Sequence, residues 1–460
     1  MMKRANTFSV VPNAQLKEMA LNNAKLWNEI TYRRRQSFFK GKINYYTGNI
    51  EEKYRQLIGS VEAQQIARKN DKAWKSFFAL LERQREGRLP PHIRVHPPGY
   101  WKDRNSGNYT KLIVIGRNDR YSLTLNPQRT VKRRDRKQGR GGVLKIKTIG
   151  RKELTLKLKG KPRWTGRQGA VEVVYDYAFG KWRVHQAVRQ AQLLEPPKQR
   201  YTQQTPEMGC GQAASDIGIV NLSATTFSDR DMPARLYKGG YVLSEWIYWT
   251  KRIAEHQRTL KQTNNKHRSR KLIRMYALRS RRVHHKLNAQ IRDEVMYASA
   301  FGVQTLRIGD LTGLRENNDK GDSANQKIHN FFQYAYRAKR YEMTTQEYNV
   351  NLRKEPEAHT SSDCSLCKER HRNGRKHRGL YHCKHHNAII NADVNGSENQ
   401  LPKVSLRPIK PLERVKAMTA SGSSQEEGRS SRAVTRPMVP HGWNQCLNRW
   451  EPRITLPSGG

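Results

Sequence analysis

Acidic residues are scarce in this chain. Its 460 residues include 39 Asp and Glu against 88 Lys and Arg, which gives a formal net charge of +49. A chain with such a charge repels itself unless a polyanion neutralises it, and nucleic acid is the expected polyanion. The charge alone also fits a ribosomal-type or tail-bearing protein.

Long apolar runs are missing as well. None approaches the roughly 18 residues that a membrane-spanning helix requires, so we expect no membrane-spanning segment. The N-terminal stretch MMKRANTFSVVPNAQ has no apolar core of signal-peptide length, which predicts a protein of the reducing cytoplasm. Hydrophobic residues make up only 35% of the chain, and the length allows about two to four domains.

Cysteine is rare, but three of the five cysteines lie close together. Cys364 and Cys367 form a C-x2-C pair, and Cys383 with His386 forms a C-x2-H pair after a gap of fifteen residues. This spacing is close to that of zinc knuckles. We predict one structural Zn²⁺ on Cys364, Cys367, Cys383 and His386, with His382 or His385 as alternative fourth ligands. A closed site of this kind holds shape and leaves no position for a substrate.

The first half of the chain changes from helical to β-rich. Apolar residues recur at helical spacing in two stretches, from Leu16 to Ile30 and from Leu57 to Leu81. Strand patterns follow, and in LTLKLK the leucines alternate with threonine and lysine, so that one face packs and the other offers positive charge. This pattern predicts a barrel or sheet that binds a nucleic-acid backbone.

The second half alternates strands and helices. Asp216 stands at the start of an apolar strand, and a long basic helical region follows to Ala300, with Val283, Leu287, Ile291 and Val295 as one apolar ladder. A strand, a helix and another strand come next, an alternation that is typical of a ribonuclease-H-like α/β fold. From Leu401 the composition predicts a mostly disordered tail, with one local element around HGWNQCLNRW.

Acidic residues on separate segments of such a fold can hold two divalent ions. Asp216 lies on a strand and Asp393 lies just past the predicted zinc ribbon. Mg²⁺ prefers carboxylate oxygen, and two ions can activate a water and stabilise the leaving oxygen in phosphodiester cleavage.

Five stretches resemble successive motifs of the TnpB-like nucleases of transposons and of compact type V CRISPR effectors. They are SDIGIVNLSAT, LRIGDLTGLREN, KIHNFFQYAYRAKRYE, HTSSDCSLC and CKHHNAIINADVNGSENQ. The resemblance is close from about Tyr201 to Leu401, covers the N-terminal half only in layout, and does not reach the tail.

The resemblance implies an α+β multidomain protein with a helical recognition lobe, a β-barrel wedge domain and a RuvC nuclease domain that carries an inserted zinc ribbon. The expected parts are a first wedge strand (1–12), the recognition lobe (13–90), the wedge domain (91–200), the RuvC domain (210–360) with a basic helix (251–300), the zinc ribbon (361–387), a final RuvC segment (388–400) and the tail (401–460).

The function that the resemblance implies is RNA-guided DNA cleavage. Such a protein reads a short motif beside its target, pairs a guide with the DNA and cuts with two Mg²⁺ ions. The expected partners are a guide RNA, either a structured omega RNA or a CRISPR RNA, and double-stranded target DNA, with no membrane. We expect a monomeric ribonucleoprotein, with a dimer as the alternative, in the prokaryotic cytoplasm at the nucleoid.

The second catalytic position departs from the family pattern. The first family aspartate falls on Asp216 and the third on Asp393, but Gly309 stands where many members have a glutamate. Three carboxylates could replace it. Asp310 should point to the opposite face of its strand, Glu316 lies in a loop, and Glu357 follows the next strand and is our preferred candidate.

Two other functions remain open at this stage. One is an RNA-guided binder that no longer cuts and acts by occupying its target, because glycine cannot bind a metal. The other is an unguided nucleic-acid-binding protein with a zinc ribbon, for which the charge alone would suffice.

Overall fold

The chain separates into two compact units, Met1–Pro196 and Pro197–Gly460. The computed structural model describes residues 2–89, 93–104, 106–125, 142–150, 152–202, 211–229, 232–264, 268–312, 321–356, 360–371, 373–377, 379–402 and 438–452. Among these residues, no helix is long and apolar enough to cross a membrane.

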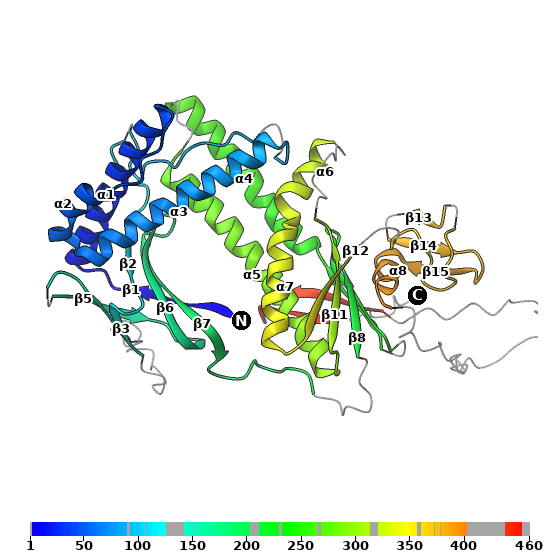
Figure 1. Ribbon diagram of the computed structural model, residues 1–460. Coiled ribbons are helices and arrows are strands. Elements are labelled where there is room, and N and C mark those ends of the chain that lie inside the picture. The colour runs from blue at the N-terminus through cyan, green and yellow to red at the C-terminus, as the bar shows by residue number, and fades with distance from the viewer. Residues whose placement is uncertain are drawn as a thin grey trace, which may run out of the picture. The chain divides into compact units, whose positions relative to one another are not determined.

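Three helices of the first unit share one core (Figure 1). They are α1 (Ala14–Phe39), α2 (Gly48–Ile58) and α3 (Ser60–Arg85). The side chain of Asn13 caps α1 by accepting a hydrogen bond from Leu16 N at 2.8 Å. Gly59 separates α2 from α3 with a positive φ of 88°, a conformation that glycine adopts without strain.

An antiparallel sheet of seven strands completes the first unit. Its order is β2-β6-β7-β1-β5-β4-β3. The strands are β1 (Lys3–Val10), β2 (Ile113–Gly116), β3 (Tyr121–Leu125), β4 (Gly142–Lys147), β5 (Glu153–Lys159), β6 (Trp164–Asp176) and β7 (Lys181–Leu193).

The sheet curls until its two ends approach each other. The end strands β2 and β3 are separated in sequence by residues 117–120 alone, and the Tyr121 hydroxyl on β3 donates to Gly169 O on β6, the neighbour of β2, at 2.8 Å. Leu154, Leu156 and Leu158 on β5 are buried and the residues between them are exposed. The alternation predicted from LTLKLK is therefore present.

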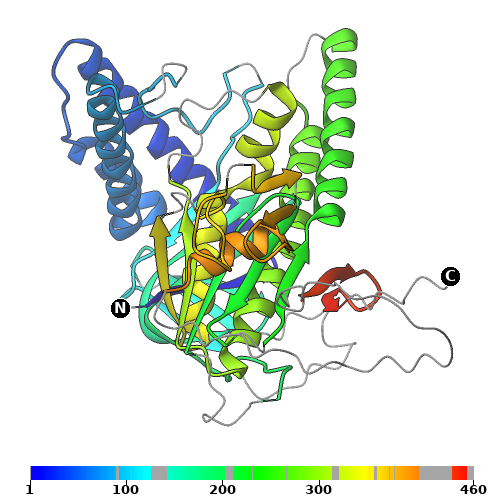
Figure 2. The same cartoon turned by 90° about the vertical axis from the view of Figure 1, so that its right-hand side faces the viewer.

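A second seven-stranded sheet, of mixed direction, forms the centre of the second unit (Figure 2). Its order is β12-β11-β8-β9-β10-β16-β17. The strands are β8 (Gln212–Asp216), β9 (Asn221–Phe227), β10 (Ala234–Lys238), β11 (Thr305–Asp310), β12 (Asn351–Pro356), β16 (Met438–Asn444) and β17 (Arg449–Pro452). Strands β8, β11 and β12 are parallel, so their carboxyl ends lie at one edge.

The tail is structured over part of the length that the sequence assigns to disorder. Strand β16 pairs in parallel with β10, and β17 pairs with β16. Trp443 and Trp450, both in the predicted local element, are buried against helix residues of the core. Two large indoles provide enough apolar area to hold this short hairpin. Residues 403–437 and 453–460 lie outside the described part of the tail.

The predicted basic helix is a pair of helices, α4 (Gly240–Asn264) and α5 (Arg270–Ala300), so the expected single element over 251–300 is wrong. The side chain of Ser269 caps α5 by accepting from Leu272 N at 3.0 Å, which starts a new helix at this position. The predicted ladder is confirmed as a packing face, because Val283, Leu287, Ile291 and Val295 are all buried.

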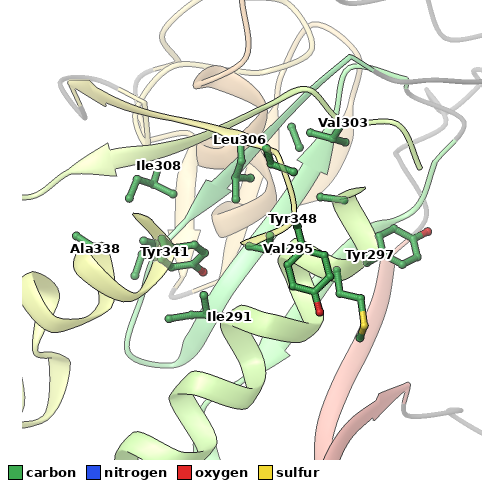
Figure 3. Close-up of a cluster of buried hydrophobic side chains, with 14 of the residues drawn as sticks. Ile291, Val295, Tyr297, Val303, Leu306, Ile308, Ala338, Tyr341 and Tyr348 are labelled. Carbon is green, nitrogen blue, oxygen red and sulfur yellow. The ribbon is translucent and has the colours of Figure 1, made fainter. Parts of the chain in front are cut away.

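Helices α5 and α7 (Tyr334–Glu347) cover one face of the second sheet. Figure 3 shows Ile291 and Val295 of α5 and Tyr341 of α7 directed toward the sheet residues Leu306 and Ile308. A short helix, α6 (Asp322–Gln326), and a π-helical turn, η3 (Lys327–Phe332), precede α7.

The opposite face of the sheet carries α8 (Ala392–Asn399), beside a small antiparallel sheet (Figure 1). Val394 of α8 packs on Ala224, Ala234 and Leu236 of β9 and β10. The small sheet contains β13 (Arg375–His377), β14 (Leu380–Cys383) and β15 (Ala388–Asn391). The mixed α/β content agrees with the predicted fold class.

Candidate active site and zinc ribbon

Asp216 ends strand β8 on the face of the sheet that α8 covers. It pairs across the strands with Ala224, which contacts α8 through Val394. Helix α8 passes so close that a Cβ added at Gly396 would lie 3.0 Å from Asp216 Oδ2. Glycine at this position therefore leaves the room that the carboxylate occupies.

Asp393 lies in the first turn of the same helix. The helix begins after Asn391, whose side chain accepts from Asp393 N at 3.0 Å. Residues three apart share one side of a helix, so Asp393 and Gly396 face the same way. The Asp393 Oδ2 atom accepts a hydrogen bond from Asn221 Nδ2 at 2.6 Å. Two carboxylates separated by 177 positions in the sequence thus lie on one face of the sheet.

Gly309 occupies the strand position beside Asp216. Ile308 of β11 pairs with Ser215 of β8, so the next positions along the two parallel strands are Gly309 and Asp216. On its other side Gly309 pairs with Glu355 of β12. Gly309 has no side chain, so β11 contributes no carboxylate to this face at that position.

Asp310 points to the opposite face, as strand alternation predicts. Its Oδ1 accepts from Thr312 N at 3.0 Å and from the hydroxyl of Tyr334, the first residue of α7, at 3.4 Å. The hydroxyl and the backbone N–H of Thr312 lower the pKa of the exposed Asp310 carboxyl. Asp310 is therefore ionised and engaged on the side away from Asp216.

Glu357 and Glu316 both lie outside the described residues. The last described residue of β12, Pro356, pairs with Asp310 at the carboxyl edge of the parallel strands. Glu355, which the sequence analysis did not consider, shares the register of Gly309. Arg307 holds the Glu355 carboxylate in an ion pair.

A buried carboxylate that was not predicted, Glu294 of α5, lies on the other side of the sheet from α8. It is 1% exposed and accepts hydrogen bonds from Ser223, Thr225, Gln290 and Tyr341 at 2.5–2.9 Å. These four donors satisfy a carboxylate. Glu294 therefore stabilises the packing of α5 and α7 on the sheet and leaves no oxygen for a metal.

Three of the four predicted zinc donors converge in the ribbon. The thiols of Cys364, Cys367 and Cys383 and a ring nitrogen of His371 all lie within 4.8 Å of one another. Three thiolates and one imidazole form an accepted structural set for Zn²⁺. Burial raises the pKa of the Cys364 thiol to about 12, a shift that a bound cation reverses. The donor set therefore fits a zinc ion.

The fourth donor differs from the prediction, because His371 takes the place expected for His386. His371 follows Cys367 in the same turn, and its Nε2 lies 3.0 Å from Cys367 Sγ. His386 Nδ1 lies 3.3 Å from Cys383 Sγ but is outside the group of four. The other candidates contact other residues, since His385 pairs with Glu369 and His382 with Asn387. The C-x3-H spacing after Cys367 was the signal in the sequence for His371.

Two family models match this chain. One, described as a probable transposase (OrfB_IS605), matches residues 193–315, and the other, the TNB domain of Cas12f1-like proteins, matches residues 336–400. A curated relative, the TnpB-like protein ORF457 of Acidianus two-tailed virus, is 29% identical over 434 residues, which cover 87% of this chain and 86% of the relative.

Solved structures show a weaker likeness. The cryo-EM structure of a Cas12f1-sgRNA-target DNA complex has a TM-score of 0.45 and 12% identity, and the match covers 84% of this chain and 82% of that chain. The mini-RNA-guided endonuclease CRISPR-Cas phi3 has a TM-score of 0.47 and 10% identity, with 89% and 93% covered. Both scores lie below 0.5, and nothing further follows from them.

The family models fall on the segments that carry the aspartates and the zinc ribbon, and the viral relative spans nearly the whole chain. Together they bear out the motif resemblance: this chain is similar to TnpB-like proteins and, over residues 336–400, to the TNB domain of Cas12f1-like proteins.

Proposed function

We propose that this protein is an RNA-guided DNA endonuclease that cleaves guide-complementary DNA by RuvC-type hydrolysis with two Mg²⁺ ions. The observation that carries the proposal is that Asp216 of β8 and Asp393 of α8 lie on one face of the sheet, in a chain with a formal net charge of +49. Oxygen donors on one face of a sheet are the kind of site that Mg²⁺ requires.

In this proposal Asp216 and Asp393 hold the metal from β8 and from α8, and Glu357 supplies the third carboxylate from the segment after β12. Bound Mg²⁺ would activate the attacking water and stabilise the leaving oxygen of the phosphodiester. Asn221 keeps Asp393 in place through its hydrogen bond. The opposite orientation of Asp310 supports Glu357 over Asp310 as the third carboxylate.

The remaining parts fit the proposed roles. Helices α1, α2 and α3 would form the recognition lobe, and the curled sheet would form the wedge domain that grips the guide RNA. Exposed lysines such as Lys145 and Lys157 on β4 and β5 offer positive charge for phosphates. In such a complex base pairing reads the target and the protein reads shape and the adjacent motif.

The zinc ribbon would act through α8. Asn395 of α8 accepts from Ser365 N and donates to Asp363 O, both at 2.7 Å, and Asn399 also donates to Asp363 O at 2.7 Å. These bonds tie the first cysteine knuckle to the helix that carries Asp393. A Zn²⁺ ion in the ribbon would therefore stabilise the position of Asp393 without taking part in the reaction.

The test is cleavage of a plasmid by the protein purified with its own RNA. The plasmid carries the sequence that matches the guide, beside a randomised flank, and the reaction is run with Mg²⁺ or with EDTA. We expect cleavage in Mg²⁺ alone, next to one short flanking motif. Absence of any discrete copurifying RNA would contradict guided recognition.

Gly309 favours a second function, an RNA-guided binder that occupies its target without cutting. Because Gly309 has no side chain, the face that holds Asp216 lacks the carboxylate that many TnpB-like nucleases have at this position. Tight, guide-dependent binding of the target with no cleavage in Mg²⁺ would establish this second function in place of the first.

A further inference from the structure

Asn221, the first residue of β9, contacts the candidate metal site through its amide nitrogen, and its amide oxygen has no assigned role. It is 5% exposed, and its Nδ2 donates to Asp393 Oδ2 at 2.6 Å. A carboxylate accepts hydrogen bonds only, so the amide nitrogen must face Asp393 and the amide oxygen must point elsewhere.

The amide oxygen of Asn221 is buried and has no hydrogen-bond partner among the described residues. Leaving a buried acceptor unpaired destabilises the folded protein. An asparagine that only oriented Asp393 would not need to bury its oxygen in this way. The orphaned Oδ1 therefore indicates a donor that binds beside Asp393 in the working protein.

The turn between β8 and β9, residues 217–220, leads into Asn221 and is held in place by hydrogen bonds. Arg337 of α7 is 1% exposed and donates to Gly218 O at 2.9 Å and to Leu222 O, one carbonyl near each end of the turn. Gly218 N donates back to Leu222 O at 3.2 Å. A Cβ at Gly218 would lie 2.7 Å from Asn221 O, so the turn closes this tightly only with glycine there.

The same short turn joins both aspartates. It begins after Asp216, and it ends at the residue that binds Asp393. The hydrogen bonds that hold this turn therefore fix Asp216 through the backbone and Asp393 through the side chain of Asn221. Residues that orient metal-binding carboxylates commonly change metal affinity by about 10–100-fold when they are lost.

We propose that Asn221 is a positioning residue of the metal site, which orients the Asp393 carboxylate and accepts a hydrogen bond at Oδ1 from a water of the Mg²⁺ hydration shell. The proposal rests on the proposed function, because it requires a divalent ion on Asp216 and Asp393. Mg²⁺ suits this role because it keeps several of its waters when it binds protein.

The test measures binding of Mn²⁺, as a spectroscopic substitute for Mg²⁺, to the full-length protein freed of RNA. Titration calorimetry compares wild type with Asn221→Ala, Asp393→Ala and the double variant. Asn70→Ala is the matched control, because Asn70 is also buried and donates to a neighbouring side chain, Thr31 Oγ1 at 2.8 Å.

We expect Asn221→Ala to weaken Mn²⁺ binding about 10–100-fold and Asn70→Ala to leave it unchanged. In the Asp393→Ala background the Asn221 substitution should add no further loss, since both residues act on one site. The Mg²⁺ concentration for half-maximal cleavage should rise by the same factor as the Mn²⁺ dissociation constant.

Two outcomes separate this inference from the proposed function. Unchanged Mn²⁺ affinity in Asn221→Ala, with the affinity lost in Asp393→Ala, overturns the role of Asn221 and leaves the metal site intact. No Mn²⁺ binding by wild type overturns the metal site itself. If Asn221→Ala does not fold, Asn221→Ser decides the matter, because its shorter side chain keeps polarity but cannot reach Asp393.

Discussion

Gly396 lets α8 pass directly over Asp216. Alanine there would place a Cβ 3.0 Å from Asp216 Oδ2 and push the carboxylate aside. Alanine also favours a helix interior over glycine by about 1 kcal/mol. We therefore expect Gly396→Ala to change the free energy of unfolding by less than about 1 kcal/mol while lowering the cleavage rate about 10-fold or more.

Gly240→Ala is the control for this substitution, because a Cβ at Gly240 meets nothing within 4 Å. Cleavage assays and thermal unfolding of both variants provide the comparison. Wild-type cleavage by a correctly folded Gly396→Ala variant would show that Asp216 does not act from this position.

Substitutions of His371 and His386 should have different effects on the zinc content of the ribbon. Because His371 completes the group of four donors, His371→Ala should reduce the zinc content of the purified protein, and His386→Ala should leave it near one ion per chain. Metal analysis by mass spectrometry measures both. The reverse pattern would assign the fourth ligand to His386, which contacts Cys383 alone among the three thiols in the described hydrogen bonds.

For single residues, the sequence predicted the types of residue that form the sites better than it predicted which residues contact one another. Asp216 and Asp393 were chosen because strand order and the distance from the ribbon restrict where such carboxylates can lie. The structure places both on one face, and their catalytic role stays a prediction. The fourth zinc donor was missed because His371 and His386 both stand at plausible spacings, and only the path of the chain between the knuckles decides which one approaches the thiols.

The C-terminal hairpin is an element whose stability depends on pH. His441 of β16 is fully buried beside Tyr237. Burial, helped by the charge of Arg235 and opposed by that of Asp293, lowers the pKa of His441 to about 4. The unfolded chain takes up a proton near pH 6.5 and the folded chain does so only near pH 4, so acidification between these values favours unfolding.

We expect this unit to lose about 2 kcal/mol of stability between pH 7 and pH 5 on account of His441. The His441→Gln variant, whose side chain does not titrate, should lose correspondingly less. Urea unfolding at the two pH values measures the difference. An equal loss in both proteins would mean that the imidazole is protonated in the native hairpin.

Helix and strand types were predicted well where apolar patterns were long. The ladder on α5 and the alternation on β5 are examples, because burial on one face dictates those periods. The break between α4 and α5 was missed because the basic, polar residues around it fit a helix as well as a turn, and Ser269 alone marks the new start. The tail hairpin was placed in the chain, but its pairing with β10 depends on tertiary contacts that no local pattern encodes.

At the scale of the whole molecule, the charge of +49 should govern RNA binding. Each phosphate neutralised by a Lys or Arg releases counterions, so affinity falls steeply with salt. We expect the affinity for the copurifying RNA to drop by about 10³-fold or more between 50 and 200 mM salt. Filter binding at several salt concentrations measures the slope.

If the exposed face of β5 binds the RNA backbone, Lys157→Ala should make the dependence of RNA affinity on salt concentration shallower. The expected change is roughly the contribution of one phosphate contact. A slope identical to that of wild type would remove this face from the RNA-binding surface. Charge and composition thus predict the class of partner, while the positions of the contacts require the fold of each unit.

The central claim is that Asp216 and Asp393 form a nuclease site on the α8 face of the sheet. The most direct test compares guided DNA cleavage in Mg²⁺ by wild type, Asp216→Ala, Asp393→Ala, Glu357→Ala and Asp310→Ala. We predict that the first three substitutions abolish cleavage and that Asp310→Ala retains it, because Asp310 points to the opposite face. Cleavage that survives in Asp216→Ala or Asp393→Ala would contradict this site.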